Sequence, residues 1–475
     1  IGRFSGGKVM DFILEINKSI GEVVWGWPML ILLLGTGLLL SSITRFTIIR
    51  KFAYIIKSTL LKMFKKDAGG DGEVSAFQAV STALAATVGT GNIAGVSLAI
   101  AVGGPGAVFW MWLSAILGMT TKFSEVALAV TYRVKNDDGS FSGGPMYYIQ
   151  RGLGHKGLAK IFALFGACAS FGIGCMTQSN SIAEALNVSF GANKTIVGVV
   201  LMVLAGVVIL GGIKRIGAVA EKLVPLMALL YIVGALAIIF ININQVPHAF
   251  GLIFGSAFTG HSAVGGFAGS TLKMAMRNGI ARGVFTNEAG LGSAPIAHAA
   301  ATTDHPVRQG MWGVFEVFMD TIVICSMTAL VVLVSGVWNS GLQGAALTTA
   351  AFQQGFTGGQ YIVSVGLTLF AFTTILGWSY YGEKCTEYLL GKKAVMAYRI
   401  LYIPLVLVGS IGGLQTIWAI SDTLNGLMAL PNLIALVLMS KVVVNLVQDF
   451  FKDPERIRTS EEEYLVAVPE KYQPK

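Results

Sequence analysis

The chain has 475 residues, of which 54% are hydrophobic and only 12% are charged, and its net charge is +9. A soluble domain carries about 25% charged residues, so this composition excludes a soluble globular protein and indicates a polytopic protein of the lipid bilayer. A nucleic-acid partner is excluded because no basic, aromatic-rich soluble segment is present. The four cysteines form no C-x-x-C pair, which argues against a metal or disulfide framework.

The beginning of the chain sets the predicted orientation. Residues 1–9 lack an initiator methionine and are interpreted as an expression remnant or a processed leader. The first apolar run, residues 23–42, is long enough to span a bilayer. Many basic residues follow between 45 and 66, which predicts that the segment up to residue 74 is cytoplasmic and that the N-terminus is outside.

Ten further spans are predicted from the apolar runs and the basic loops between them. The first five are expected at residues 75–102, 106–133, 161–186, 195–211 and 223–241. After an outside loop at 242–263, the second five are expected at 264–300, 310–334, 361–383, 395–412 and 415–440. A short surface helix is expected at 344–356, and the tail 441–475 is predicted to be cytoplasmic.

The two sets of five start on opposite sides of the membrane, and each opens with a glycine-interrupted helix. The interruptions lie in A-A-T-V-G-T-G-N-I-A-G at residues 85–95 and in residues 285–300. Broken backbone at membrane depth is tolerated where it lines a cavity, and there it offers amides to anions and carbonyls to cations. The pattern predicts an all-α inverted-repeat transporter with eleven transmembrane helices. For either stretch alone, close helix packing through glycine is the alternative.

Three motifs carry a resemblance to a known family: G-T-G-N-I-A-G at 89–95, G-G-P-G-A-V-F-W-M-W at 103–112 and N-E-A-G-L-G-S-A-P-I-A-H-A at 287–299. They resemble signatures of the alanine or glycine:cation symporter family, and the resemblance covers nearly all of residues 75–440. It implies a LeuT-type fold of five plus five helices behind one extra N-terminal helix. It also implies uptake of alanine and glycine with co-transported Na+ across the plasma membrane, by a protein that works as a monomer.

A more distant resemblance to LeuT implies a set of ligands. The substrate carboxylate is assigned to the amides of Thr90 and Gly91, and its ammonium to the carbonyls of Thr87, Phe285 and Thr286. One sodium is assigned to the Thr87 carbonyl, the Asn92 amide oxygen and Thr286. The other is assigned to the carbonyls of Ala85, Val88 and Phe370 with the hydroxyls of Thr373 and Thr374. The seventh core helix has no clear equivalent of the LeuT asparagine, and Glu316 and Asp320 are its nearest polar groups.

Five further side chains are candidates for the pocket wall. Phe285, Leu291 and Trp378 are expected to crowd the helix breaks and to restrict the substrate to a small side chain. Gln178 and Glu288 are polar at membrane depth, where ionisable groups are usually functional. The alternatives are helix–helix hydrogen bonding for Gln178 and a structural ion pair with Arg282 for Glu288.

Other charged side chains receive a separate interpretation. Lys273, Arg277 and Arg282 lie on the wrong side for the positive-inside rule and are interpreted as lining a wet outer vestibule. Glu125 is expected near a span end as a gate or interfacial charge. His298 is expected to hydrogen-bond a neighbouring helix.

Other classes of function are less consistent with the sequence. An enzyme is unsupported because no nucleophile–base pair, H-E-x-x-H motif or P-loop occurs. A channel would need repeated selectivity rings, usually in an oligomeric pore. A proton-coupled carrier of the same fold is the closest rival, and it would be expected to place a carboxylate where Thr373 and Thr374 stand.

Overall fold

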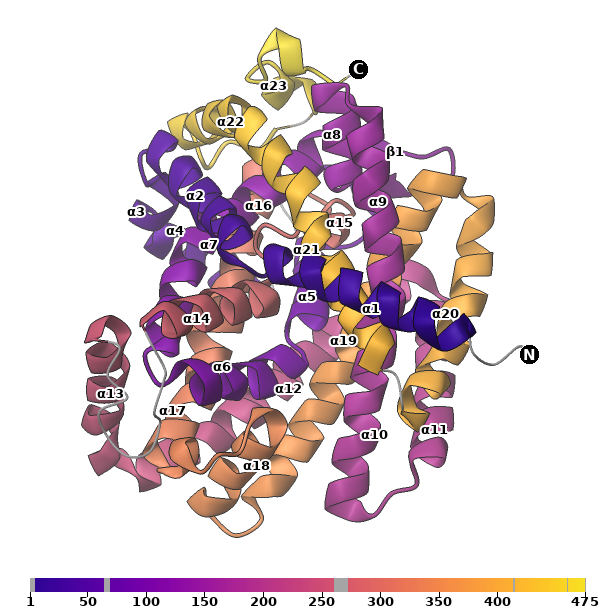
Figure 1. The fold of residues 1–475 in the computed structure, drawn as a ribbon. Coiled ribbons are helices and arrows are strands. Elements are labelled where there is room, and N and C mark those ends of the chain that lie inside the picture. The colour runs from indigo at the N-terminus through magenta and orange to yellow at the C-terminus, as the bar shows by residue number, and fades with distance from the viewer. Residues whose placement is uncertain (1–4, 64–68, 260–271, 413–414, 459, 475) are drawn as a thin grey trace.

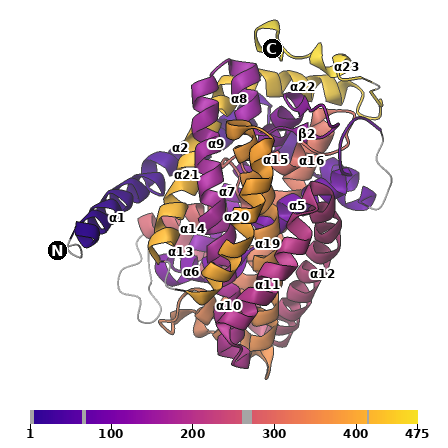
Figure 2. The same ribbon diagram turned by 90° about the vertical axis from the view of Figure 1, so that its right-hand side faces the viewer.

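The computed structural model describes residues 5–63, 69–259, 272–412, 415–458 and 460–474. This part of the chain forms a bundle of packed helices (Figure 1), and its paired strands are the short β1 (Val134–Lys135) and β2 (Phe141–Ser142). The two strands are antiparallel, with Val134 opposite Ser142. They lie at the same end of the bundle as the C-terminus (Figure 2).

The first predicted set of five spans corresponds to a run of helices with two interruptions. Its elements are α5 (Ala76–Thr87), η2 (Gly91–Gly95), α6 (Val96–Gly103), α7 (Ala107–Thr131), α9 (Lys156–Phe171), η3 (Gly172–Met176), α10 (Thr177–Phe190), α11 (Lys194–Ile209) and α12 (Gly212–Ile241). The fifth of these helices begins eleven residues earlier than predicted, because the polar stretch before residue 223 is helical.

The second set is interrupted in the same way near its start. Its elements are α14 (Leu272–Asn287), α15 (Pro295–His298), α16 (Pro306–Val317), η5 (Phe318–Cys325), α17 (Ser326–Val334), α19 (Gly359–Leu390), α20 (Lys393–Ile411) and α21 (Gln415–Leu438). The predicted beginning of this set at residue 264 lies outside the described residues.

Further elements lie outside these two sets. They are α1 (Ser5–Val24), α2 (Trp27–Ile43), α3 (Thr47–Arg50), α4 (Phe52–Thr59), η1 (Leu60–Lys62), α8 (Pro145–Leu153), η4 (Ile243–Gln245), α13 (Val246–Thr259), η6 (Val337–Asn339), α18 (Gly344–Gly355), α22 (Ser440–Lys452), α23 (Glu462–Leu465) and η7 (Glu470–Tyr472). The short helix α18 confirms the prediction at 344–356. The predicted loop after residue 242 is instead helical in α13, and α1 begins inside the segment interpreted as a remnant.

Eight helices of the described residues are long and apolar enough to cross a bilayer, and the bent pair α5 and η2–α6 makes a ninth. The predicted count of eleven is therefore not confirmed. The two remaining predicted spans are not long and apolar enough as continuous helices. The helix α11 has only 16 residues, and α14, which carries Lys273, Arg277 and Arg282, is interrupted after Asn287.

Local sequence explains where the first broken helix starts and stops. The Ser75 hydroxyl accepts a hydrogen bond from the Gln78 backbone amide, and Oε1 of Gln78 accepts one from the Ser75 backbone amide, so a capping box begins α5. The chain leaves the helix at Val88 and bends by 51° before it continues. Wide π-helical turns occur at η2, η3 and η5. Such turns often mark functional sites.

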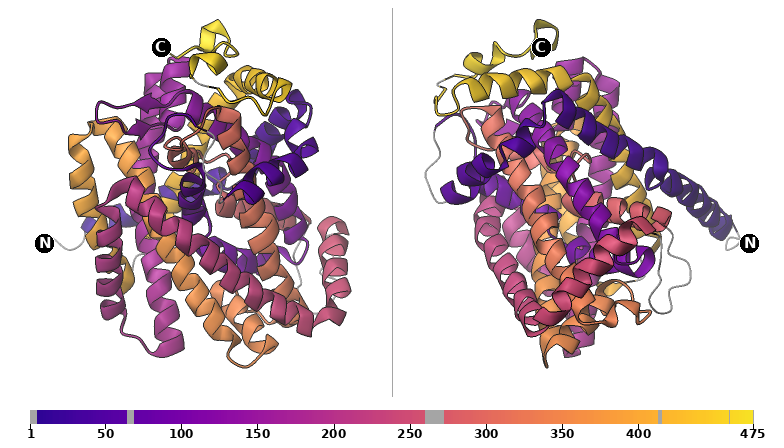
Figure 3. Two further views of the ribbon diagram at one scale, coloured as in Figure 1. Left: turned by 180° about the vertical axis from the view of Figure 1, so that it is seen from behind. Right: turned by 90° about the vertical axis from the view of Figure 1, so that its left-hand side faces the viewer.

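Packing brings the two broken helices to the centre of the bundle. The long helix α7 packs against both α14 and α16, and α19 packs against α5, α9, α10 and α12. The views in Figure 3 place α22 across the end of the bundle that carries the C-terminus, while α1 projects from its side. The buried face of α22 is apolar and includes Val442, Val443, Leu446 and Phe450.

Candidate functional site

A narrow pocket lies between the two broken helices. Its volume is about 20 Å³, which is room for about one water molecule, since a water needs about 10–15 Å³. Its lining residues come from both breaks and from η3, α10, α19 and α21: Ala86, Thr87, Gly89, Thr90, Gly91, Ile173, Gln178, Phe285, Thr286, Glu288, Thr374, Trp378 and Asn425.

A much larger vestibule adjoins the pocket. Its volume is about 530 Å³, and Arg282 and Asp422 lie in its wall. Thr90, Gly91, Gln178 and Phe285 line both spaces, so they form the partition between them. Of the three basic residues predicted to line an outer vestibule, Arg282 lies in this wall, whereas Arg277 does not and Lys273 lines a separate groove. The Arg282 guanidinium lies 5.5 Å from the centroid of the Phe285 ring.

The first break exposes backbone in a confined space. The Gly89 amide donates to Oδ1 of Asn92 over 2.9 Å, which fixes the turn. The amides that follow stand at the start of a helix, where no intrahelical acceptor exists for the first turn. A Cβ on Gly89 would lie 2.7 Å from Oγ1 of Thr374, and one on Gly91 would lie 2.7 Å from Cγ2 of Thr286. A side chain at either position would therefore force the facing threonine to move.

The second break places a carboxylate in the pocket. Glu288 has φ of +54°, a left-handed conformation that non-glycine residues rarely adopt. Its Oε1 accepts from Nε1 of Trp378 over 3.0 Å, and its Oε2 accepts from the Ser293 hydroxyl. These bonds replace the predicted alternative of a Glu288–Arg282 ion pair, because Arg282 lies over Phe285 instead.

Two further side-chain acceptors in the pocket wall have no hydrogen-bond partner among the described residues. They are Oε1 of Gln178 and Oδ1 of Asn425, and both are buried. The Gln178 amide nitrogen is held by the Ile173 carbonyl at 3.0 Å, which leaves its oxygen as the free end. Buried polar groups without partners are costly, so this pair of acceptors with the Glu288 carboxylate favours a ligand that donates hydrogen bonds.

A first group of polar side chains surrounds Asn92 and is the first candidate cation site. Nδ2 of Asn92 donates to Oδ1 of Asp320 over 2.6 Å, and the other Asp320 oxygen accepts from the Thr321 hydroxyl at 2.8 Å. Thr286 joins the same group through Cys325, whose Sγ accepts from Nδ2 of Asn92 and lies 3.8 Å from Oγ1 of Thr286. Of the two acidic residues in the seventh core helix, Asp320 therefore belongs to this group, whereas Glu316 does not.

A second group of oxygens lies at the end of α5, and the described groups that form it are neutral. Oγ1 of Thr373 and Oγ1 of Thr374 both donate to the Phe370 carbonyl, over 2.9 and 3.0 Å. Oγ1 of Thr374 is 3.5 Å from the Val88 carbonyl oxygen. The structure thus brings the threonine pair of α19 to the end of α5, where Ala85 is also buried.

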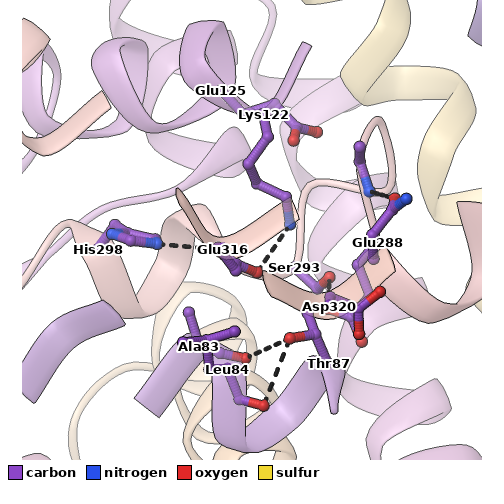
Figure 4. Close-up of polar contacts among 12 residues, drawn as sticks. Ala83, Leu84, Thr87, Lys122, Glu125, Glu288, Ser293, His298, Glu316 and Asp320 are labelled. Atoms are coloured by element: carbon purple, nitrogen blue, oxygen red, sulfur yellow. Dashed lines mark hydrogen bonds and ion pairs between the residues drawn. The ribbon is translucent and has the colours of Figure 1, made fainter. Parts of the chain in front are cut away.

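A chain of buried charges lies behind the pocket (Figure 4). Nζ of Lys122 is 3.2 Å from Oε1 of Glu316, and both side chains are fully buried. His298 bonds the other Glu316 oxygen at 3.0 Å, which confirms a hydrogen bond between helices. Glu125 was expected near a span end, but it is completely buried and its Oε1 accepts from the Gly290 amide over 3.1 Å.

Most of the predicted substrate-binding residues line this pocket, but some of its lining residues were not predicted. Leu291 was predicted to crowd the pocket; it is fully buried, but it is not part of the pocket wall that the described residues form. Ile173, Asn425 and Asp320 were not assigned to the site. The isolated polar residues of the tenth core helix, in S-D-T-L-N at 421–425, were the available signal for Asn425.

Comparisons with known proteins find relatives along nearly the whole chain. The profile of the sodium:alanine symporter family matches residues 10–464. The chain is 48% identical over 444 residues to the sodium/alanine symporter AgcS of Methanococcus maripaludis, covering 92% of this chain and 96% of that protein. It is 51% identical over 444 residues to an uncharacterized transporter of Haemophilus influenzae, covering 93% and 96%.

A solved structure shows the same fold at low sequence identity. The crystal structure of MhsT in complex with L-phenylalanine aligns with a TM-score of 0.54 at 13% identity, covering 85% of this chain and 98% of that chain. MhsT is a LeuT-fold transporter, so the predicted LeuT-type fold is confirmed.

Proposed function

The chain belongs to the sodium:alanine symporter family, and on that premise we propose that it carries alanine and glycine into the cell together with sodium. The observation that carries the proposal is the pocket itself. Two helix breaks face each other there, with helix-start amides on one side and unpartnered acceptors and a carboxylate on the other.

The pocket matches the two ends of a small zwitterion. A carboxylate or ammonium is too costly to bury alone, so each end needs a partner. The amides of Thr90 and Gly91 face a helix start, whose partial positive charge suits the carboxylate. Oε1 of Gln178, Oδ1 of Asn425 and the Glu288 carboxylate suit the ammonium, together with the carbonyls at Thr87, Phe285 and Thr286. The narrow volume and the Trp378 ring favour a hydrogen or methyl side chain.

Sodium prefers oxygen ligands, and both groups beside the first break supply them. The first would use the Thr87 carbonyl, Asn92, Thr286 and the Asp320 carboxylate. The second would use Thr373 and Thr374 with the carbonyls of Ala85, Val88 and Phe370. Because both groups share the first break with the substrate amides, cation and substrate should each improve the binding of the other, and this coupling is reciprocal.

Transport then requires the pocket to open to each side in turn. The vestibule of about 530 Å³ stands next to a pocket that has room for about one water, so substrate entry needs movement at the partition. We propose that the vestibule faces outside and the C-terminal tail faces the cytoplasm, following the distribution of basic residues. We also propose that the chain works in the plasma membrane as a monomer, because one chain contributes both helix breaks to the pocket.

Uptake into proteoliposomes with imposed gradients tests the proposal. Inward sodium gradients should drive accumulation of labelled alanine, and replacing sodium with choline at fixed pH should stop it. Alaninamide, which lacks the carboxylate, should not compete, and leucine should not be carried. Uptake driven by a proton gradient without sodium would instead support the proton-coupled carrier.

A further inference from the structure

The extra N-terminal helices touch the partition between pocket and vestibule. Trp25 stands in the bend between α1 and α2, outside both sets of five helices. Its ring packs edge-on against Phe285, with centroids 6.1 Å apart. We propose that Trp25 is a positioning residue that holds the Phe285 ring in place as the lid of the substrate pocket.

Phe285 is the large side chain of the partition. It lines both the pocket and the vestibule, and the Arg282 guanidinium lies 5.5 Å from its ring centroid. The ring is therefore held by a cation on one side and by an indole on another. Aromatic pairs of this kind prefer edge-to-face geometry and restrict each other's orientation, so removing the indole should free the lid.

Trp25 is itself fixed by both helices that border the lid. Its Nε1 donates to the Asp422 carbonyl on α21 over 3.3 Å, and its carbonyl accepts from Nε of Arg277 on α14 over 3.3 Å. It also lies against the α21 backbone, since a Cβ on Gly426 would be 3.1 Å from its Cε2. Trp25 thus bridges α14, which carries the lid, to α21, which carries Asn425 of the pocket.

This inference rests on the proposed pocket and deepens it. The lid must move for substrate to enter a pocket of about 20 Å³. A contact that favours the closed position of the lid therefore sets how often the pocket is reached from the vestibule. Trp25 would act through Phe285 without touching the substrate.

Cysteine accessibility in purified, nanodisc-embedded full-length protein tests the inference without any substrate. The reporters are Ile173→Cys, which lies in the pocket wall, and Ser181→Cys, which lies in the vestibule wall. Labelling by a charged methanethiosulfonate is measured against the same protein without the added cysteine. Because no substrate is used, a failure of alanine transport and a failure of this inference are separate results.

The expected result is selective. Trp25→Ala should raise the labelling rate of Ile173→Cys roughly three- to tenfold, the range that an aromatic pair supports, and leave Ser181→Cys unchanged. Trp25→Phe should restore the parent rate, because it keeps a ring against Phe285. The matched control is Trp27→Ala, since Trp27 is the first residue of α2, directly after the bend, but lines a groove formed with Leu272, Lys273 and Met276.

Two outcomes would overturn the inference. One is an unchanged Ile173→Cys rate in folded Trp25→Ala protein, and the other is an equal rise at both reporters, which indicates general loosening. Where Trp25→Ala does not fold, Trp25→Leu takes its place. In a Phe285→Leu background the Trp25 substitution should have no added effect on Ile173→Cys, and a persisting increase there contradicts a role through the Phe285 ring.

Discussion

The two candidate cation groups beside the first break are built from different chemistry. The first contains the buried Asp320 carboxylate, whose oxygens are bonded by Asn92 and Thr321. The second contains neutral hydroxyls and carbonyls at Thr373, Thr374 and Val88. A buried charge interacts far more strongly than a dipole in a medium of low dielectric constant. The first group should therefore bind its cation more tightly and should depend on one residue, whereas the second spreads its binding over several.

The difference also affects coupling to the substrate. Asp320 and a substrate carboxylate at Gly91 would be two negative charges near one broken segment, and like charges disfavour each other. A cation between them removes that repulsion, so the first group should couple sodium to substrate strongly. The second group has no charge to neutralise and should act mainly by fixing α5 against α19.

The largest expected effect comes from crowding the first group. Gly91→Val should abolish alanine uptake, because even a Cβ there would lie 2.7 Å from Cγ2 of Thr286. Thr90→Val should be milder, since recognition by backbone amides does not need the hydroxyl. Initial rates of sodium-driven uptake measure both. The control is Gly95→Ala, where the nearest atom to an added Cβ is 4.0 Å away. Equal losses for Gly91→Val and Thr90→Val would point to a hydroxyl contact.

Neutralising the charged group is expected to have the next largest effect. Asp320→Asn should raise the sodium concentration for half-maximal uptake roughly a hundredfold, because hydrogen bonds to charged groups contribute ~1.5–3 kcal/mol. The side chain keeps its size, so packing is preserved. Sodium titrations at saturating alanine provide the measurement. If Asp320→Asn shifts the half-saturating sodium concentration no more than a threonine substitution in the second group does, the two groups do not differ in how strongly they bind the cation.

The neutral group should respond more weakly. Thr373→Ala and Thr374→Val should each shift sodium half-saturation roughly tenfold, since one lost neutral ligand is comparable to an unsatisfied buried hydrogen bond of ~1–3 kcal/mol. Alanine affinity should recover at saturating sodium because the coupling is thermodynamic. Serine at either position keeps the oxygen and should behave as the parent. Serine variants as impaired as the alanine and valine variants would show that the methyl groups matter instead.

The contrast between the groups shows what the sequence could and could not reveal. The breaks were predictable because Gly89, Gly91 and Asn92 are out of place in an apolar run where lost hydrogen bonds are not replaced by water. The threonine pair was predictable by resemblance. Asp320 was not assigned because it lies within the π-helical turn Phe318–Cys325, whose wider turn changes the direction of side chains from that expected at 3.6 residues per turn.

Other residues were missed because their position depends on tertiary packing. Asn425 reaches the pocket from the tenth core helix, and no local pattern tells which face of that helix meets the breaks. Trp25 lies outside the internal repeat, so no second copy of its position exists for comparison. Leu291 was predicted to crowd the pocket because it lies inside the second break. The chain there turns through Glu288 and Gly290, both at positive φ, so a residue of the break need not face the pocket.

The smallest expected effect leaves both cation groups unchanged. Trp378→Phe removes the Nε1 donor that lies 3.0 Å from Oε1 of Glu288 but keeps an aromatic ring in the pocket wall. The Ser293 hydroxyl still holds the other carboxylate oxygen, so Glu288 loses one of two partners. One hydrogen bond contributes ~0.5–1.5 kcal/mol net, and the half-saturating alanine concentration should therefore rise roughly threefold. Sodium half-saturation at saturating alanine should stay at the parent value, because neither group contains this indole. A parallel shift in sodium dependence would mean that Glu288 belongs to the cation sites, and the division between charged and neutral groups would then have to include it.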